Sequence, residues 1–162
     1  MRALLAVREP KVLVNLGAWS IGRKMPASAF PLSRSHSYQV GASWHWCVAD
    51  ARAKGQEFKI LIAFNAGKFD YRAWLSLRYG NDYALLARLE HHRSHKGWHI
   101  HCKRGPCDGL VRGVVKEPLD RDRSRTCGAA PFEVGHHDAL KLAFRSFNVS
   151  GESQFSEGEL HL

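Results

Sequence analysis

Hydrophobic residues are most concentrated in the run from Phe58 to Phe64, where apolar and β-branched side chains fill a stretch of strand length. The Asn-Ala-Gly sequence that follows is typical of a turn, so we expect the strand to end there. Shorter apolar runs bounded by polar residues predict further strands. These strands are expected over residues 12–14, 83–90, 98–102 and 109–115.

Three other segments carry patterns typical of helices. Residues 136–147 have apolar side chains at helical spacing, and residues 68–79 show the same spacing. Residues 40–54 also look helical, because Gly55 is a suitable stop signal. Taken in order, the predicted elements are β, α, β, α, β, β, β and α. This order favours an α+β domain with a largely antiparallel sheet.

Length and composition fit one domain. Of the 162 residues, 44% are hydrophobic, which is enough for a core and excludes a wholly disordered chain. We expect one α+β domain over residues 1–147, beginning with an irregular basic segment over residues 1–35, and a flexible acidic tail over residues 148–162. No stretch has the roughly 18 apolar residues of a membrane span. Four cysteines in a chain of this length favour reduced thiols, so a cytoplasmic protein with no membrane partner is expected.

The charge of the chain indicates a class of partner. Lys and Arg number 24 against 15 Asp and Glu, which gives a net charge of +9 with neutral histidines. A body this basic attracts polyanions, and nucleic acid is the commonest polyanion inside a cell. The sequence has no Walker loop, dinucleotide fingerprint, nucleophile elbow or zincin motif. ATP hydrolysis, hydride transfer and zincin proteolysis are therefore poorly supported.

Histidine is concentrated in one short segment, because five of the ten histidines lie within residues 91–101. If residues 83–102 form a hairpin, His99 and His101 project from one face of a strand. A connection over residues 91–98 then places Glu90 opposite His99, on the same face. Two imidazoles and a carboxylate suit a divalent metal ion such as Mn²⁺, Mg²⁺ or Zn²⁺. A register slip of one residue would turn Glu90 to the other face.

Other interpretations of this region stay open. If residues 84–96 are a helix, His91 and His95 lie four residues apart on one side and form a different metal pair. A structural zinc site is a further alternative, since thiolates and imidazoles are zinc ligands. Its candidate ligands are Cys102, Cys107, Cys127 and His136 or His137. The histidines could also form a solvated polar loop.

The segment resembles the HUH endonuclease superfamily, which comprises rolling-circle replication initiators and relaxases. Its signature is two histidines separated by one bulky apolar residue on a strand, here His99-Ile100-His101. Glu90 precedes this motif at a distance similar to that of the third metal ligand in viral initiators. The apolar strand at residues 58–65 resembles the family's first motif. The resemblance covers residues 56–104 and implies a ferredoxin-like fold, a central antiparallel sheet with helices packed on it.

The chemistry that this resemblance implies is specific. A divalent ion, Mn²⁺ or Mg²⁺ with Zn²⁺ as an alternative, would be held by Glu90, His99 and His101 and would polarise a phosphate of single-stranded DNA. A tyrosine would attack that phosphate and leave a 5′-phosphotyrosine link. The sequence departs from the family here, because no tyrosine follows Tyr83. An upstream nucleophile, as in relaxases, would be Tyr38, which lies in a basic segment.

Basic residues near these motifs are candidates for binding the phosphate backbone. They are Arg88, Arg93, Lys96, Lys103 and Arg104 around the histidines, and Lys141 and Arg145 on the last predicted helix. Our first hypothesis is a divergent HUH-like domain of a plasmid or phage protein that binds and nicks single-stranded nucleic acid, DNA before RNA. The alternatives are a non-catalytic zinc-stabilised nucleic-acid-binding or inhibitor protein, and a nuclease that uses metal-activated water.

Overall fold

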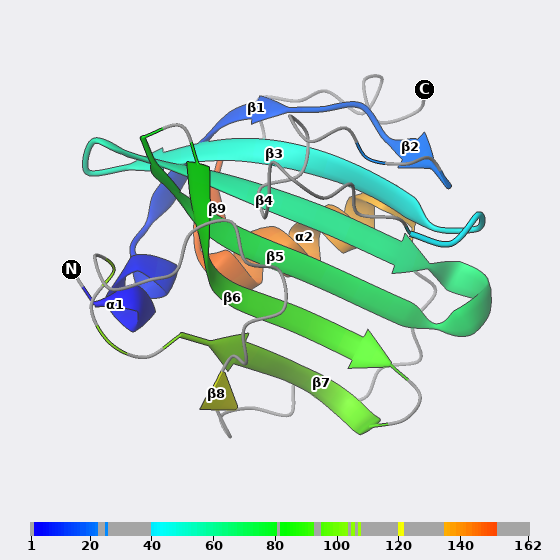
Figure 1. Cartoon of the computed structure of the whole chain (residues 1–162). Helices are drawn as coiled ribbons and strands as arrows, with labels where there is room; N and C mark the ends of the chain where they lie inside the picture. The colour runs from blue at the N-terminus through cyan, green and yellow to red at the C-terminus, as the bar shows by residue number, and fades with distance from the viewer. Residues whose placement is uncertain are drawn as a thin grey trace.

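One twisted β-sheet dominates the computed structural model (Figure 1). The structure describes residues 2–22, 25, 40–80, 82–92, 95–103, 105, 107, 120–121 and 135–151. Among them, the strands are β1 (Lys11–Leu16), β2 (Ser20–Ile21), β3 (His45–Ala53), β4 (Gln56–Asn65), β5 (Asp70–Tyr79), β6 (Asp82–His92), β7 (His95–Cys102), β8 (Asp120–Arg121) and β9 (Val149–Ser150). The helices are α1 (Ala3–Arg8), α2 (His136–Phe147) and the short 3₁₀ helix η1 (Ala66–Lys68).

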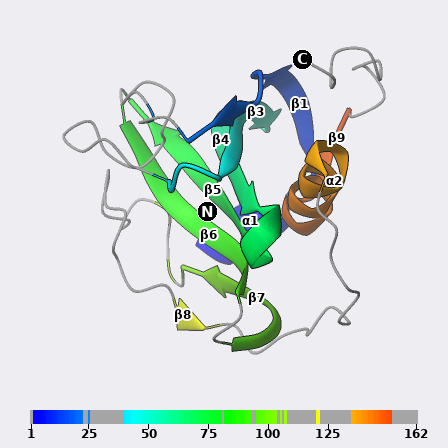
Figure 2. The same ribbon diagram turned by 90° about the vertical axis from the view of Figure 1, so that its right-hand side faces the viewer.

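The strands follow the order β8-β7-β6-β5-β4-β3-β1-β9, and β2 pairs with β3 beside this path. Pairing is antiparallel throughout this path except between β1 and β9, which run parallel. Figure 2 shows the sheet curling from β1 towards β7 around the side on which α1 and α2 lie. The curl makes the sheet a half-barrel with one covered concave face.

Alternation along the strands gives the sheet two different faces. The face that packs against α2, here called the helix face, carries the larger core, which includes Ile60, Ile62 and Leu75. The opposite face, here called the tryptophan face, buries Trp46 and Trp74 around Leu61 and Ala63, among others. Side chains at successive positions of a strand point to opposite faces, so the central strands β3, β4, β5 and β6 contribute buried side chains to both cores.

Helix α2 confirms the helix predicted over residues 136–147. Its buried side chains are Ala139, Leu140, Ala143, Phe144 and Phe147. They lie on one side of the helix because they recur at intervals of three to four residues. The Tyr71 hydroxyl on β5 donates a hydrogen bond of 2.8 Å to the carbonyl oxygen of Ala139, which fixes the helix against the sheet. Asn148 ends the helix in the left-handed conformation.

The expectation of a ferredoxin-like α+β fold is wrong, because more than half of the described residues lie in strands and α2 is the one long helix among them. The predicted helices over residues 40–54 and 68–79 correspond to β3 and β5. In β5, Tyr71, Ala73, Leu75 and Leu77 alternate along the helix face, which is the two-residue period of a strand. These segments form strands although their alanine and leucine content favours a helix, because burial of side chains on both faces of the sheet outweighs intrinsic helix propensity.

Other predicted strands agree with the structure. Strands β1, β4, β6 and β7 contain the segments predicted over residues 12–14, 58–64, 83–90 and 98–102. The segment expected to be irregular at the N-terminus contains α1, β1 and β2, and β9 in the expected tail pairs with β1. The strand predicted over residues 109–115 lies outside the described residues. Within the described part of the chain, no helix has the length and apolar character to cross a membrane.

Candidate metal centre

The β6–β7 hairpin places the predicted ligands on one face. Glu90 pairs directly with His99, and Arg88 pairs with His101. This is the register expected from the sequence, although the strands extend further into the connection than expected. A register shift follows Glu90, where His92 pairs with His95 and Gly97 has a φ of 92°. The extra residues of β7 thus form a bulge next to the candidate ligands.

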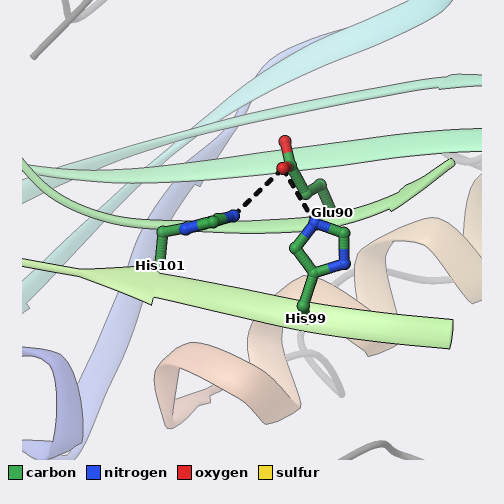
Figure 3. A group of neighbouring side chains, drawn as sticks. All are labelled: Glu90, His99 and His101. Atoms are coloured by element: carbon green, nitrogen blue, oxygen red, sulfur yellow. Dashed lines mark hydrogen bonds and ion pairs between the residues drawn. The ribbon is translucent and has the colours of Figure 1, made fainter. Parts of the chain in front are cut away.

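The three side chains converge on one atom (Figure 3). The Nε2 atom of His99 lies 2.9 Å from Oε1 of Glu90, and the Nε2 atom of His101 lies 3.1 Å from the same oxygen. Ligands held about 2.1 Å from one ion in neighbouring octahedral positions are about 3 Å apart, so these spacings suit a common ion. The three ligand atoms all lie within 4.8 Å of one another, and the group could hold a metal ion.

The surroundings keep the carboxyl group ionised. Burial would raise the pKa of Glu90, but the positive charge of Arg88 and the hydrogen bond to His99 outweigh burial, so the pKa lies below its usual value. Arg88 approaches both carboxylate oxygens, with Nε 2.9 Å from Oε2 and one terminal nitrogen 3.3 Å from Oε1. Burial lowers the pKa of His101, although Glu90 acts in the opposite direction. The site therefore offers an anionic oxygen and an imidazole that favours the neutral form, as metal ligation requires.

The outer nitrogen of His99 has a partner of its own. Nδ1 lies 3.4 Å from the carbonyl oxygen of Gly97, so a proton on Nδ1 leaves Nε2 available as a ligand. Histidine ligands in metal sites commonly donate their second N–H to a carbonyl or carboxylate. The bulge at Gly97 thus orients the ring of His99 in the way that a metal site needs.

An open pocket of about 720 Å³ adjoins the carboxylate. It is lined by Gly67, Lys68, Asp70, Arg72, Arg88, Glu90 and His92. Arg72 on β5 pairs with Glu90 on β6 and with Ala63 on β4, which places the metal group on the tryptophan face. The guanidinium carbon of Arg72 lies 5.1 Å from the centre of the Trp44 ring. The cationic side chains of Lys68, Arg72 and Arg88 therefore line a pocket next to the candidate metal ligands.

Lys68, Arg72 and His92 were missed from the sequence. His92 joins the site because it follows Glu90 by two residues on β6, whereas the sequence placed it in the connection over residues 91–98. Lys68 and Arg72 join it through the pairing of β5 with β6, and residues 68–79 were predicted to be a helix. The Gly80-Asn81 pair is a signal of a two-residue hairpin that could have revealed this pairing. Counting from that turn would still place Arg72 opposite Leu89, because a register shift between Leu75 and Ser76 moves its partner to Glu90.

The structure brings some predicted basic residues to the site and separates others. Arg88 lies in the pocket, and the backbone N–H of Lys103 donates to the carbonyl of Leu86 just beyond β7. Lys141 and Arg145 are exposed on α2, which covers the opposite face of the sheet. Arg93, Arg104 and the side chain of Lys96 lie outside the described residues, as does the proposed nucleophile Tyr38.

The alternative ligand sets do not assemble in the described part of the chain. The helix that would pair His91 with His95 is instead the β6–β7 hairpin, where His91 Nδ1 lies 2.9 Å from the carbonyl oxygen of Phe69. His136 directs Nε2 to Nδ1 of His45 at 2.9 Å. Cys102 and Cys107 are buried thiols, and no group of three described metal-ligating residues includes them. Cys127 lies outside the described residues, and His137 is exposed.

Comparisons with protein-family models, with curated proteins and with solved structures find no match to this chain. The HUH resemblance therefore stays a prediction that rests on the His99-Ile100-His101 motif and Glu90.

Proposed function

We propose that this protein binds single-stranded nucleic acid, DNA before RNA, through a divalent ion on Glu90, His99 and His101, and cleaves its phosphodiester backbone there. The observation that carries the proposal is the convergence of the Nε2 atoms of His99 and His101 on one carboxylate oxygen of Glu90, beside a pocket whose lining includes Lys68 and Arg72 as well as Asp70. The proposal keeps the chemistry of the histidine motif without the fold that the resemblance implied.

The pocket favours a phosphate as the ligand. Lys68 and Arg72 are not metal ligands, and they lie beside the site where a substrate oxygen would enter. Guanidinium groups bind phosphate oxygens through paired N–H donors, and the net charge of +9 attracts a polyanion over a longer range. A divalent ion at the site would supply Lewis acid polarisation of a phosphate oxygen.

The group that attacks phosphorus would be either a tyrosine hydroxyl or a water molecule. Of the tyrosines that the structure describes, Tyr71 is buried on the helix face and donates to Ala139. Tyr79 and Tyr83 lie near the turn of the β5–β6 hairpin, at the end away from Glu90. Tyr83 precedes Glu90 by seven residues, which is about 23 Å along the strand. Tyr38, which lies outside the described residues, is thus the tyrosine that we propose as the nucleophile. The hydroxyl would lose its proton, its oxygen would bond to phosphorus while the P–O3′ bond breaks, and the released 3′ oxygen would take up one proton in return.

The test is a denaturing gel of the protein with end-labelled single-stranded oligonucleotides and Mn²⁺. We expect cleavage by the natural protein, loss of cleavage in His99→Ala, and retention in His91→Ala, whose ring lies on the other face of the hairpin. A labelled band that migrates with the protein and vanishes in Tyr38→Phe would identify tyrosine as the nucleophile. Cleavage without such a band would identify water. Equal behaviour of His99→Ala and the natural protein would overturn the proposal.

A further inference from the structure

His92 is a further imidazole beside the candidate metal ligands. Its Nε2 atom lies 3.6 Å from Oε1 of Glu90, the oxygen that His99 and His101 also approach. The rings of His92 and His99 meet edge to face with centroids 5.0 Å apart. His92 also lines the open pocket, and 20% of its side chain is exposed. His92 therefore lies next to the metal group, and like Glu90 it borders the pocket from which a ligand would enter.

The strand explains why His92 belongs to this face and His91 does not. His92 follows Glu90 by two residues on β6, so both side chains point to the tryptophan face. His91 lies between them and turns to the helix face, where its ring lies against Trp98 with centroids 5.0 Å apart. Strand β7 pairs with His92 at His95, bulges over the next three residues and pairs with Glu90 at His99. His91 and His92 are thus adjacent in the sequence, but their side chains lie on opposite faces of the sheet.

We propose that His92 is a fourth protein ligand, which makes a centre of three imidazoles and one carboxylate that prefers a transition metal ion to Mg²⁺. The inference rests on the proposed metal function and names the class of ion. Imidazole nitrogen suits Zn²⁺, Co²⁺ and Mn²⁺ better than Mg²⁺, which prefers oxygen ligands and keeps much of its water. The distance of 3.6 Å between Nε2 of His92 and Oε1 of Glu90 is somewhat longer than the roughly 3 Å between neighbouring ligands of an octahedral ion, so a short movement of the ring would bring His92 into the same coordination shell.

Ligation by His92 requires a small movement of its ring. The tight group of ligand atoms within 4.8 Å of one another contains Glu90, His99 and His101, and His92 stands outside it. The ring borders the open pocket, so a rotation towards the ion does not require the sheet to move. His92 would take one position of a six-coordinate ion at the edge of the pocket, and the positions that no side chain fills would stay available to a phosphate oxygen or water.

The test uses Co²⁺ as a spectroscopic probe and Mg²⁺ as the comparison, with affinities measured by calorimetry in metal-free buffer. We expect His92→Ala to lower the Co²⁺ affinity by about tenfold or more, since loss of even an outer-shell partner costs that much. The visible Co²⁺ absorption should also change, while the weaker Mg²⁺ affinity should change little. The matched control is His91→Ala, which should leave both affinities and the spectrum unchanged. A second variant, His92→Gln, should show the same loss of Co²⁺ affinity, and thermal unfolding curves check that both His92 variants are folded.

The outcomes separate this inference from the function on which it rests. If His92→Ala binds Co²⁺ with the same affinity and spectrum as His91→Ala, while His99→Ala loses the ion, His92 is not a ligand and the three-residue centre stands. If the natural protein binds Co²⁺ no better than His99→Ala does, the proposed function itself fails.

Discussion

Lys11 is a buried charge whose ammonium group is fully occupied by backbone oxygens. Nζ donates to the carbonyls of Val7, Glu9 and Phe147 at 2.9, 2.8 and 2.8 Å. These acceptors belong to α1, to the turn after it and to the end of α2, so one side chain joins three parts of the chain. Burial lowers the pKa of Lys11 to about 8, although Glu9 acts to raise it.

Replacing Lys11 by methionine should destabilise the protein, because three carbonyls lose their donors inside the core. We expect the free energy of unfolding to fall by about 2 kcal/mol at pH 7 in denaturant titrations. The matched control is Lys54→Met, since Lys54 makes an exposed ion pair with Glu9 and such pairs contribute little. Equal stability of Lys11→Met and the natural protein would contradict this role.

The same residue predicts a pH dependence with a definite sign. The unfolded chain holds the proton of Lys11 with a pKa near 10.5, and the folded protein holds it with a pKa of about 8. Between these values the unfolded state binds more protons, so the contribution of Lys11 to stability rises with pH. The difference in unfolding free energy between the natural protein and Lys11→Met should therefore grow from pH 7.5 to pH 9.5. Burial raises the pKa of Cys47 and of Tyr71. Both groups are present in the natural protein and in Lys11→Met, so their effects on stability cancel in the difference between the two proteins.

Among the helices and strands, the sequence predicted correctly those segments in which buried side chains are either continuous or recur on one side only. The uniformly apolar run in β4 and the one-sided apolar pattern of α2 identified both correctly. Strands β3 and β5 were missed because each buries side chains on both faces, so alanine, tryptophan and leucine fall at spacings that also fit a helix. The metal group was predictable because it depends on one local hairpin. The pocket was not, because it depends on the non-local pairing of β5 and a register shift.

The bulge in the β6–β7 hairpin should matter to the metal centre as well as to stability. Gly97 has a φ of 92°, which residues with a side chain rarely adopt, so Gly97→Ala should lower the free energy of unfolding by about 1–2 kcal/mol. It should also weaken Mn²⁺ binding, since Gly97 precedes His99 and its carbonyl faces Nδ1 of that ring. Calorimetry with denaturant titration measures both effects.

Gly55→Ala is the matched control for this bulge variant. Gly55 has a φ of 73° in the tight turn between β3 and β4, and an added Cβ would meet nothing within 4 Å. The strain should cost similar stability there without any change in Mn²⁺ affinity. Equal Mn²⁺ affinities in the two glycine variants would show that the bulge does not position His99.

At the scale of the whole molecule, a basic chain with its cations beside the metal group should bind single strands in a salt-dependent way. With four phosphate contacts, affinity for a single-stranded oligonucleotide should fall by about fiftyfold between 50 and 200 mM salt. Arg72→Met should reduce the slope of log affinity against log salt by about 0.7, the value of one contact. Fluorescence anisotropy measures this slope.

Arg52→Met removes the same charge at a distance from the pocket, where Arg52 pairs with Glu57 at 3.1 Å. Its salt slope should match that of the natural protein. If Arg52→Met and Arg72→Met reduce the slope equally, net charge alone attracts the nucleic acid and the pocket has no special part in binding.

The metal centre is tested most directly by the number of Mn²⁺ ions bound per chain, counted by electron paramagnetic resonance during a titration. We expect one ion for the natural protein and for His91→Ala, and loss of that ion in His99→Ala and in Glu90→Gln, with all four proteins folded by circular dichroism. A natural protein that binds no Mn²⁺, or a His99→Ala protein that binds one ion with unchanged affinity, would contradict a metal centre at Glu90, His99 and His101.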